Sequence, residues 1–63
     1  MKIMNFQETD LVKRKYDIEQ NTEYTWEITR VYEDREGNTI IDIQDTNDEY
    51  HEETCYPEQL VRV

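Results

Sequence analysis

The stretch that decides the fold is TWEITRVY at residues 25–32, followed after a polar segment by IIDIQ at residues 40–44. In both halves, β-branched and aromatic residues alternate with polar ones, which is the period-two pattern of a half-buried β-strand. Gly37, the only glycine of the chain, lies between the two halves. The sequence therefore predicts a β-hairpin over Trp26–Gln44 that supplies most of the core.

Side-chain parity predicts the register of this hairpin. A four-residue loop, Asp34–Gly37, pairs Ile28 with Ile43 and needs no bulge, and Gly37 then takes the left-handed conformation that ends such a loop. The inward face is predicted to carry Trp26, Ile28, Ile41 and Ile43.

The same register pairs Val31 with Ile40 on the outward face of the hairpin. An apolar pair on that face is not ordinary core. We expect it either to be covered by the N-terminal segment or to belong to a contact surface.

The segments before the hairpin are less regular. Residues 1–10 contain Ile3, Met4 and Phe6 and are predicted to form an edge strand or a tail. Residues 11–16 are predicted to form a first strand, with a helix over residues 7–16 as the alternative. Residues 17–23 are polar and predict a loop.

The segments after the hairpin predict a meander. Residues 45–49 (DTNDE) indicate a tight turn, because Asp and Asn side chains hydrogen-bond their own backbone. Tyr50–Tyr56 reads as the next strand, which Pro57 ends because it lacks an N–H. Pro57–Leu60 fits one short helical turn, and residues 60–63 a closing strand. The predicted fold class is all-β, five-stranded, with a single domain over residues 1–63.

This layout resembles the SH3-like small β-barrels, in which a long loop follows the first strand and a single 3₁₀ turn precedes the last. The stretch YPEQLV at residues 56–61 is similar to the segment that leads into the closing strand of these barrels. In signalling SH3 domains, further aromatic residues bind proline-rich peptides. Here only Pro57 matches that set, since Leu60 replaces the turn tyrosine and Trp26 lies one strand earlier. The resemblance thus implies the architecture without the peptide-binding activity.

Composition limits what so short a chain can do. With 63 residues, the core holds about ten substantial side chains and leaves little volume for a substrate cleft. Apolar residues make up 35% and charged residues 37%, a balance that leans toward disorder. Seven aromatic residues and the alternating pattern favour a folded domain instead. We therefore expect a non-enzymatic protein.

The charge is strongly acidic, with 16 acidic and 7 basic residues and a net charge of −9. From Asp17 onward there are 14 acidic and three basic residues, a net of −11. Such a surface repels a phosphate backbone and suits a basic protein partner. We expect no direct binding to nucleic acid, although the charge alone could simply maintain solubility.

One cysteine, Cys55, cannot form an internal disulfide and weakly indicates a reducing compartment. No apolar run reaches the length of a signal peptide or a membrane span. These features predict a cytoplasmic protein that does not enter a membrane.

The sequence contains only weak motifs for catalysis or metal binding, and we expect neither a cofactor nor a metal. On one strand, His51 and Cys55 lie about 13 Å apart, too far for a shared zinc or a direct catalytic pair. Residues 45–49 begin like a calcium loop, but Tyr50 stands where glycine is required and Tyr56 where a glutamate is required. Cys55 is predicted to be a small core residue.

Two functions of different kinds remain open. The first is a protein-binding module, such as a regulator of a larger protein, since tyrosines are enriched at interfaces. The second is a bacteriophage-type inhibitor that mimics DNA and occupies the basic groove of a host protein. Homodimerisation through an edge strand is compatible with both. The candidate binding residues are Tyr24, Tyr32, Tyr50, Val31, Ile40, Asp48, Glu49, Glu52 and Glu53.

Overall fold

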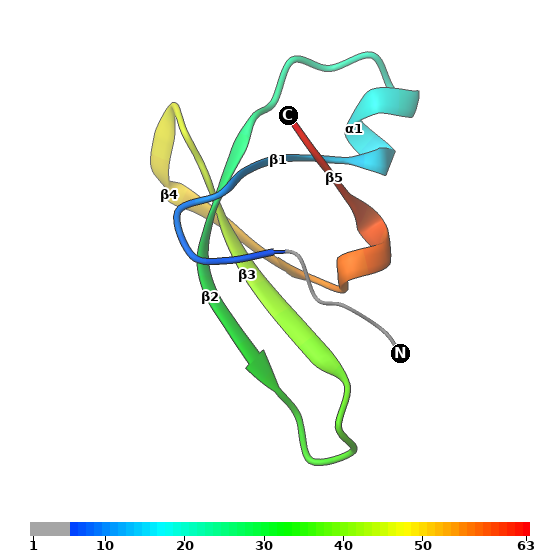
Figure 1. Ribbon diagram of the computed structural model, residues 1–63. Helices are drawn as coiled ribbons and strands as arrows, with labels where there is room; N and C mark the ends of the chain where they lie inside the picture. Colours follow the sequence, from blue (N-terminus) through cyan, green and yellow to red (C-terminus); the bar gives the residue numbers. More distant parts are fainter. Residues whose placement is uncertain (1–5) are drawn as a thin grey trace.

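The computed structural model describes residues 6–63 and has five antiparallel strands in one sheet. The order across the sheet is β4-β3-β2-β1-β5, so the predicted five-stranded all-β fold is confirmed, although the sheet does not close into a complete barrel. Figure 1 shows β2 and β3 as the long central pair, with β5 crossing beside β1. The strands are β1 (Leu11–Arg14), β2 (Trp26–Glu33), β3 (Thr39–Asp45), β4 (Asp48–Cys55) and β5 (Leu60–Arg62).

The central hairpin forms as predicted, but its register contains a bulge. Ile28 lies opposite Ile43, as parity predicted. The loop is one residue longer than expected, because Oδ1 of Asp34 accepts hydrogen bonds from the N–H groups of both Glu36 and Asn38 at 2.9 Å. One extra residue in β2, Thr29, compensates for the longer loop and has no partner on β3. Gly37 has a φ of +83°, which confirms its left-handed conformation.

The bulge overturns the predicted outward pair of Val31 and Ile40. A shift of one residue moves every later side chain of a strand to the other face. Val31 therefore lies opposite Ile41 and packs against the core, while Tyr32 lies opposite Ile40. The outward apolar pair is Tyr32 and Ile40, and the prediction for Val31 was wrong.

The β3–β4 hairpin confirms the second turn. The N–H of Asn47 donates to Oδ1 of Asp45 at 2.8 Å, and β4 starts two residues before the predicted strand over Tyr50–Tyr56. The ladder is interrupted, because Gln44 pairs with Glu52 whereas the next residue, Asp45, pairs with Asp48. Residues 49–51 consequently have no partner on β3.

The first strand is shorter than predicted. It ends at Arg14, and a five-residue helix, α1 (Lys15–Glu19), follows within the expected strand and loop. The helical turn places Asp17 three residues after Arg14, where its carboxylate receives two hydrogen bonds from that guanidinium. Tyr16 therefore lies exposed on the helix and not on the strand predicted over residues 11–16.

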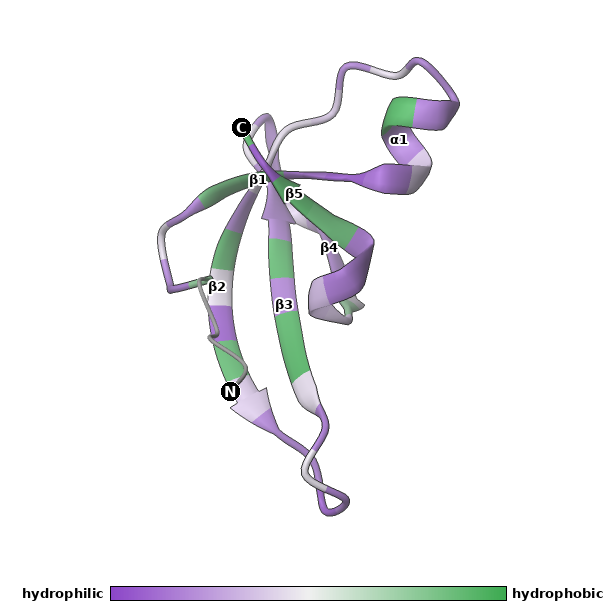
Figure 2. Ribbon diagram, turned by 45° about the vertical axis from the view of Figure 1, so that its right-hand side comes forward, coloured by the Kyte–Doolittle hydropathy of each residue, from purple (hydrophilic) through white to green (hydrophobic). Residues whose placement is uncertain are grey.

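The core draws side chains from all five strands and follows the predicted pattern. Apolar and polar bands alternate along β2 and β3 (Figure 2). The predicted inward residues are all at most 1% exposed, and the 3₁₀ turn η1 (Pro57–Gln59) precedes β5 as expected. The buried apolar set is Val12, Trp26, Ile28, Ile41, Ile43, Cys55 and Leu60.

The N-terminal segment joins the sheet in part. Ile28 accepts a backbone hydrogen bond from Thr9 and donates one to Asp10, and Phe6 packs against the core. The predictions for Ile3 and Met4 lie outside the described residues. In residues 6–63, no helix has the length and apolar character needed to cross a membrane.

Candidate functional site

Strand β4 carries the densest group of predicted binding residues. All of its side chains are exposed except those of His51, which is half-buried, and Cys55, which is buried. Within residues 6–63, the only contact of its carboxylates with a basic side chain is between Glu53 and Nε2 of His51, at 3.6 Å. The strand therefore presents four carboxylates with little neutralisation, from Asp48, Glu49, Glu52 and Glu53.

Tyr50 is the most exposed aromatic residue, at 90%. It lies in the part of β4 that has no partner on β3, directly after the turn, and its N–H donates to Oδ1 of Asp48 at 3.0 Å. A tyrosine ring left in water loses the free energy that burial of its apolar area would gain. Its position is thus suited to contact with another molecule.

His51 connects this acidic strand to the core. Its ring makes T-shaped contacts with the rings of Trp26 and Tyr24, at centroid distances of 4.8 Å and 5.6 Å. Nδ1 lies 3.2 Å from Oδ2 of Asp45, a carboxylate that is only 5% exposed. Tyr24, which is 41% exposed, is thereby held beside the start of β4. Sequence reasoning missed this role of His51.

Among residues 6–63, Asp17 is the most deeply buried charged residue, at 2% exposed. Arg14 donates to both carboxylate oxygens, at 2.7 and 2.8 Å, and Nε1 of Trp26 donates to Oδ2 at 2.9 Å. The Arg14 hydrogen bond lowers the pKa of Asp17, and the same bond raises the pKa of Arg14. Because both carboxylate oxygens of Asp17 and the indole N–H of Trp26 are paired, we interpret this cluster as a structural element. The sequence contained no signal for it beyond the need of a buried indole for an acceptor.

The outward face of the hairpin holds Tyr32 and Ile40, but its polar groups are already paired. The guanidinium of Arg30 lies 4.2 Å from the ring centre of Tyr32. Oδ1 of Asp42 accepts from the Thr54 hydroxyl at 2.9 Å and lies 3.5 Å from the Tyr32 hydroxyl. Tyr32 is therefore less available to a partner than Tyr50.

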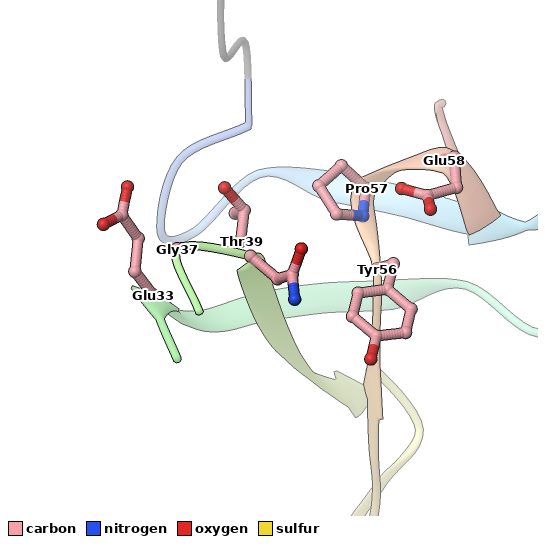
Figure 3. Close-up of a pocket in the computed structure, with 7 residues that line it drawn as sticks. Glu33, Gly37, Thr39, Tyr56, Pro57 and Glu58 are labelled. Atoms are coloured by element: carbon pink, nitrogen blue, oxygen red, sulfur yellow. The ribbon is translucent and has the colours of Figure 1, made fainter. Parts of the chain in front are cut away.

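A shallow pocket lies between the β2–β3 loop and η1 (Figure 3). Tyr56, Pro57 and Glu58 form one side of it, and Glu33, Gly37 and Thr39 the other. Tyr56 is 44% exposed, and its N–H donates to Oε1 of Gln59 at 2.8 Å. The pocket is acidic and polar, and none of the residues predicted to bind a partner line it.

Cys55 is buried at the end of β4, and its thiol lies 3.7 Å from the carbonyl oxygen of Ile41. Burial raises the pKa of this thiol to about 11. It thus remains protonated near neutral pH and is a poor nucleophile. Within residues 6–63, no group of three His, Cys, Asp or Glu side chains is arranged to hold a metal ion.

The structure thus gathers five of the nine predicted binding residues on β4 and holds Tyr24 beside them through His51. Tyr32 and Ile40 lie apart on the outward face, and Val31 belongs to the core rim. Compared with known protein families, with curated proteins and with solved structures, the chain gives no match.

Proposed function

We propose that this protein is a small non-enzymatic binding module that docks on a basic surface of another protein through β4. The observation that carries the proposal is the combination on one strand of four nearly unneutralised carboxylates with a tyrosine that is 90% exposed. Carboxylates steer a basic partner to the surface, and a central aromatic side chain supplies burial once contact is made.

The charge distribution favours a protein partner over nucleic acid. The net charge is −9, and three of the six basic residues at positions 6–63 are held by other groups of the chain. Arg14 pairs with Asp17, Arg62 pairs with Asp10, and Lys13 donates to the Tyr24 carbonyl oxygen at 3.1 Å. A phosphate backbone would therefore meet repulsion near β4, whereas lysine and arginine side chains would be attracted.

Affinity capture from a cell lysate, at about 0.05 M and about 0.5 M salt, tests the proposal. The informative variant neutralises the β4 carboxylates through Asp48→Asn, Glu49→Gln, Glu52→Gln and Glu53→Gln. A matched control removes the same number of charges elsewhere, through Glu8→Gln, Glu23→Gln, Glu27→Gln and Glu36→Gln. We expect basic proteins to be retained at low salt by the wild type and the control, and to be lost from the β4 variant.

Two further measurements refine the result. Tyr50→Ala is expected to weaken capture by about tenfold, because buried interface tyrosines contribute about 1–2 kcal/mol or more. Competition by duplex DNA would identify the captured protein as a nucleic-acid-binding protein and would favour the DNA-mimic form of the function. Equal capture by the β4 variant and its control would contradict the proposal.

A further inference from the structure

Strand β4 is an open edge of the sheet. In the order β4-β3-β2-β1-β5, its one hydrogen-bonded neighbour among residues 6–63 is β3 (Figure 1). At its C-terminal end, a groove lies between Glu53–Cys55 and α1, so the edge is not covered by a packed element there. An edge of this kind exposes unpaired N–H and C=O groups that can accept another strand.

The register identifies the residues whose backbone groups face outward. Ile28 directs its N–H and C=O to Asp10 and Thr9, away from β3. Ile28 and its partner Ile43 therefore form a non-hydrogen-bonded pair of the antiparallel ladder. In such a pair each residue directs its N–H and C=O away from the other strand, so those of Ile43 are directed toward β4. Ile43 pairs with Glu53, so the neighbours of Glu53 direct their N–H and C=O groups away from the sheet. The outward pair is Glu52 and Thr54.

The charge of this edge argues against pairing with a second copy of the same strand. Two antiparallel β4 strands paired about Glu52–Thr54 would set Glu53 opposite Glu53 of the second copy, and like charges on facing strands destabilise a sheet. A strand that carries lysine or arginine at alternate positions would instead set positive charges opposite the β4 carboxylates, and such opposite-charge pairs stabilise a sheet. Lys15, on the far side of the groove, is the one cation beside the edge that has no carboxylate partner in the described chain.

We propose that β4 binds its partner by strand addition, with an extended basic segment pairing along Glu52–Thr54. This inference rests on the proposed binding function and specifies its geometry. Main-chain hydrogen bonds to the outward residues provide affinity, and alternate lysine or arginine side chains opposite Glu52 provide selectivity. Tyr50, on the unpaired part of the same strand, is placed to cover the end of the added segment.

A synthetic hexapeptide, Lys-Val-Lys-Val-Lys-Val, serves as the probe, titrated into the full chain while amide exchange is followed by NMR. We expect slower exchange at Glu52 and Thr54. Glu52→Pro removes the outward N–H without removing a bond to β3, as edge strands tolerate. It is expected to weaken peptide binding at least about tenfold, against about threefold or less for Glu52→Ala, which removes the charge but keeps the N–H.

A second probe keeps the protein unchanged, in case Glu52→Pro does not fold. The same peptide with every backbone amide N-methylated keeps its charges but cannot donate hydrogen bonds from its backbone, and we expect it to bind at least about tenfold more weakly. Equal binding of both peptides would overturn strand addition while leaving a charge-based binding function intact. Absence of peptide binding at low salt would overturn strand addition too, and the lysate capture with charge variants would then decide the broader proposal.

Discussion

The indole N–H of Trp26 donates a 2.9 Å hydrogen bond to Oδ2 of Asp17, a carboxylate nine residues earlier in the chain. Because Asp17 also receives two hydrogen bonds from Arg14, it connects the end of β1 to the centre of the core. The guanidinium of Arg14 lies 4.6 Å from the ring centre of Trp26 and completes the arrangement. This cluster fixes the course of the segment between β1 and β2, whose other side chains are exposed except that of Thr25, which is half-buried.

Asp17→Ala is expected to destabilise the fold strongly. It leaves a buried indole N–H without an acceptor, which costs about 1–3 kcal/mol, and it also releases the Arg14 guanidinium. We expect the free energy of unfolding, measured by urea denaturation, to fall by about 3 kcal/mol. The control is Glu19→Ala on the exposed side of α1, with a change within about 0.5 kcal/mol. Equal stability of the two variants would contradict this role of Asp17.

Asp17 should also make stability depend on pH. Its hydrogen bonds, chiefly from Arg14, lower its pKa in the folded chain below the ordinary value of 3.8. The folded state then binds fewer protons than the unfolded state, so this contribution is present above the ordinary pKa and is lost as pH falls through the folded value. We expect unfolding free energies to decrease below about pH 4.

Asp17→Asn tests the source of this pH dependence, because it removes the titrating group and keeps an acceptor. Unfolding curves collected from neutral pH down to about pH 2 should give a smaller slope for Asp17→Asn than for the wild type. Part of the slope should persist, since backbone hydrogen bonds, led by that from Asn38, also lower the pKa of Asp34. An unchanged slope would indicate that Asp17 does not titrate differently in the two states.

Gly37→Ala isolates the cost of backbone conformation in the β2–β3 loop. Gly37 has a φ of +83°, and a Cβ atom placed there would meet no heavy atom within 4 Å. The penalty is therefore conformational, about 1–2 kcal/mol for an L-residue in the left-handed region. Gly37→Asn should cost less, because asparagine enters that region more readily. Thermal unfolding of both variants would show the order, and equal effects would argue against a conformational origin.

The hairpin shows how far sequence reasoning reaches. Alternation placed Trp26, Ile28, Ile41 and Ile43 in the core, and the single glycine located the turn. The bulge at Thr29 could not be predicted, because it depends on the side chain of Asp34, which stabilises a loop one residue longer. Parity arguments assume an unbroken ladder, and one extra residue reverses every later assignment on the strand.

The sequence predicted the negative charge of the candidate site on β4, but it did not predict the side-chain contacts that hold the surrounding structure. The exposed carboxylates of β4 follow from the sequence DEYHEETC, in which few apolar residues favour burial. Asp17 and His51, which hold the surrounding structure, were missed because Trp26 lies nine residues after Asp17 and Asp45 lies six residues before His51, so these partners meet them only after folding. Polar residues with such tertiary partners carry no local pattern.

Cys55 is expected to react slowly with thiol reagents in the folded protein. Burial raises its pKa to about 11, so the thiolate needed for reaction is scarce at pH 8. Relative to an unperturbed thiol with a pKa of about 8.5, we expect labelling by iodoacetamide to be at least about a hundredfold slower. Labelling in denaturing urea provides the reference rate. Comparable rates in the two conditions would mean that the end of β4 opens readily.

The bulge at Thr29 makes Val31 and Ile40 differ in their contribution to stability. Val31 faces Ile41 and the core, whereas Ile40 faces Tyr32 on the outward side. Val31→Asn would place an amide against apolar side chains, so we expect a loss of about 2 kcal/mol in the free energy of unfolding. Ile40→Asn makes the same kind of change on the other face and should cost less than half as much. Equal losses in urea denaturation, or a larger loss for Ile40→Asn, would favour the unbulged register, in which both side chains share one face.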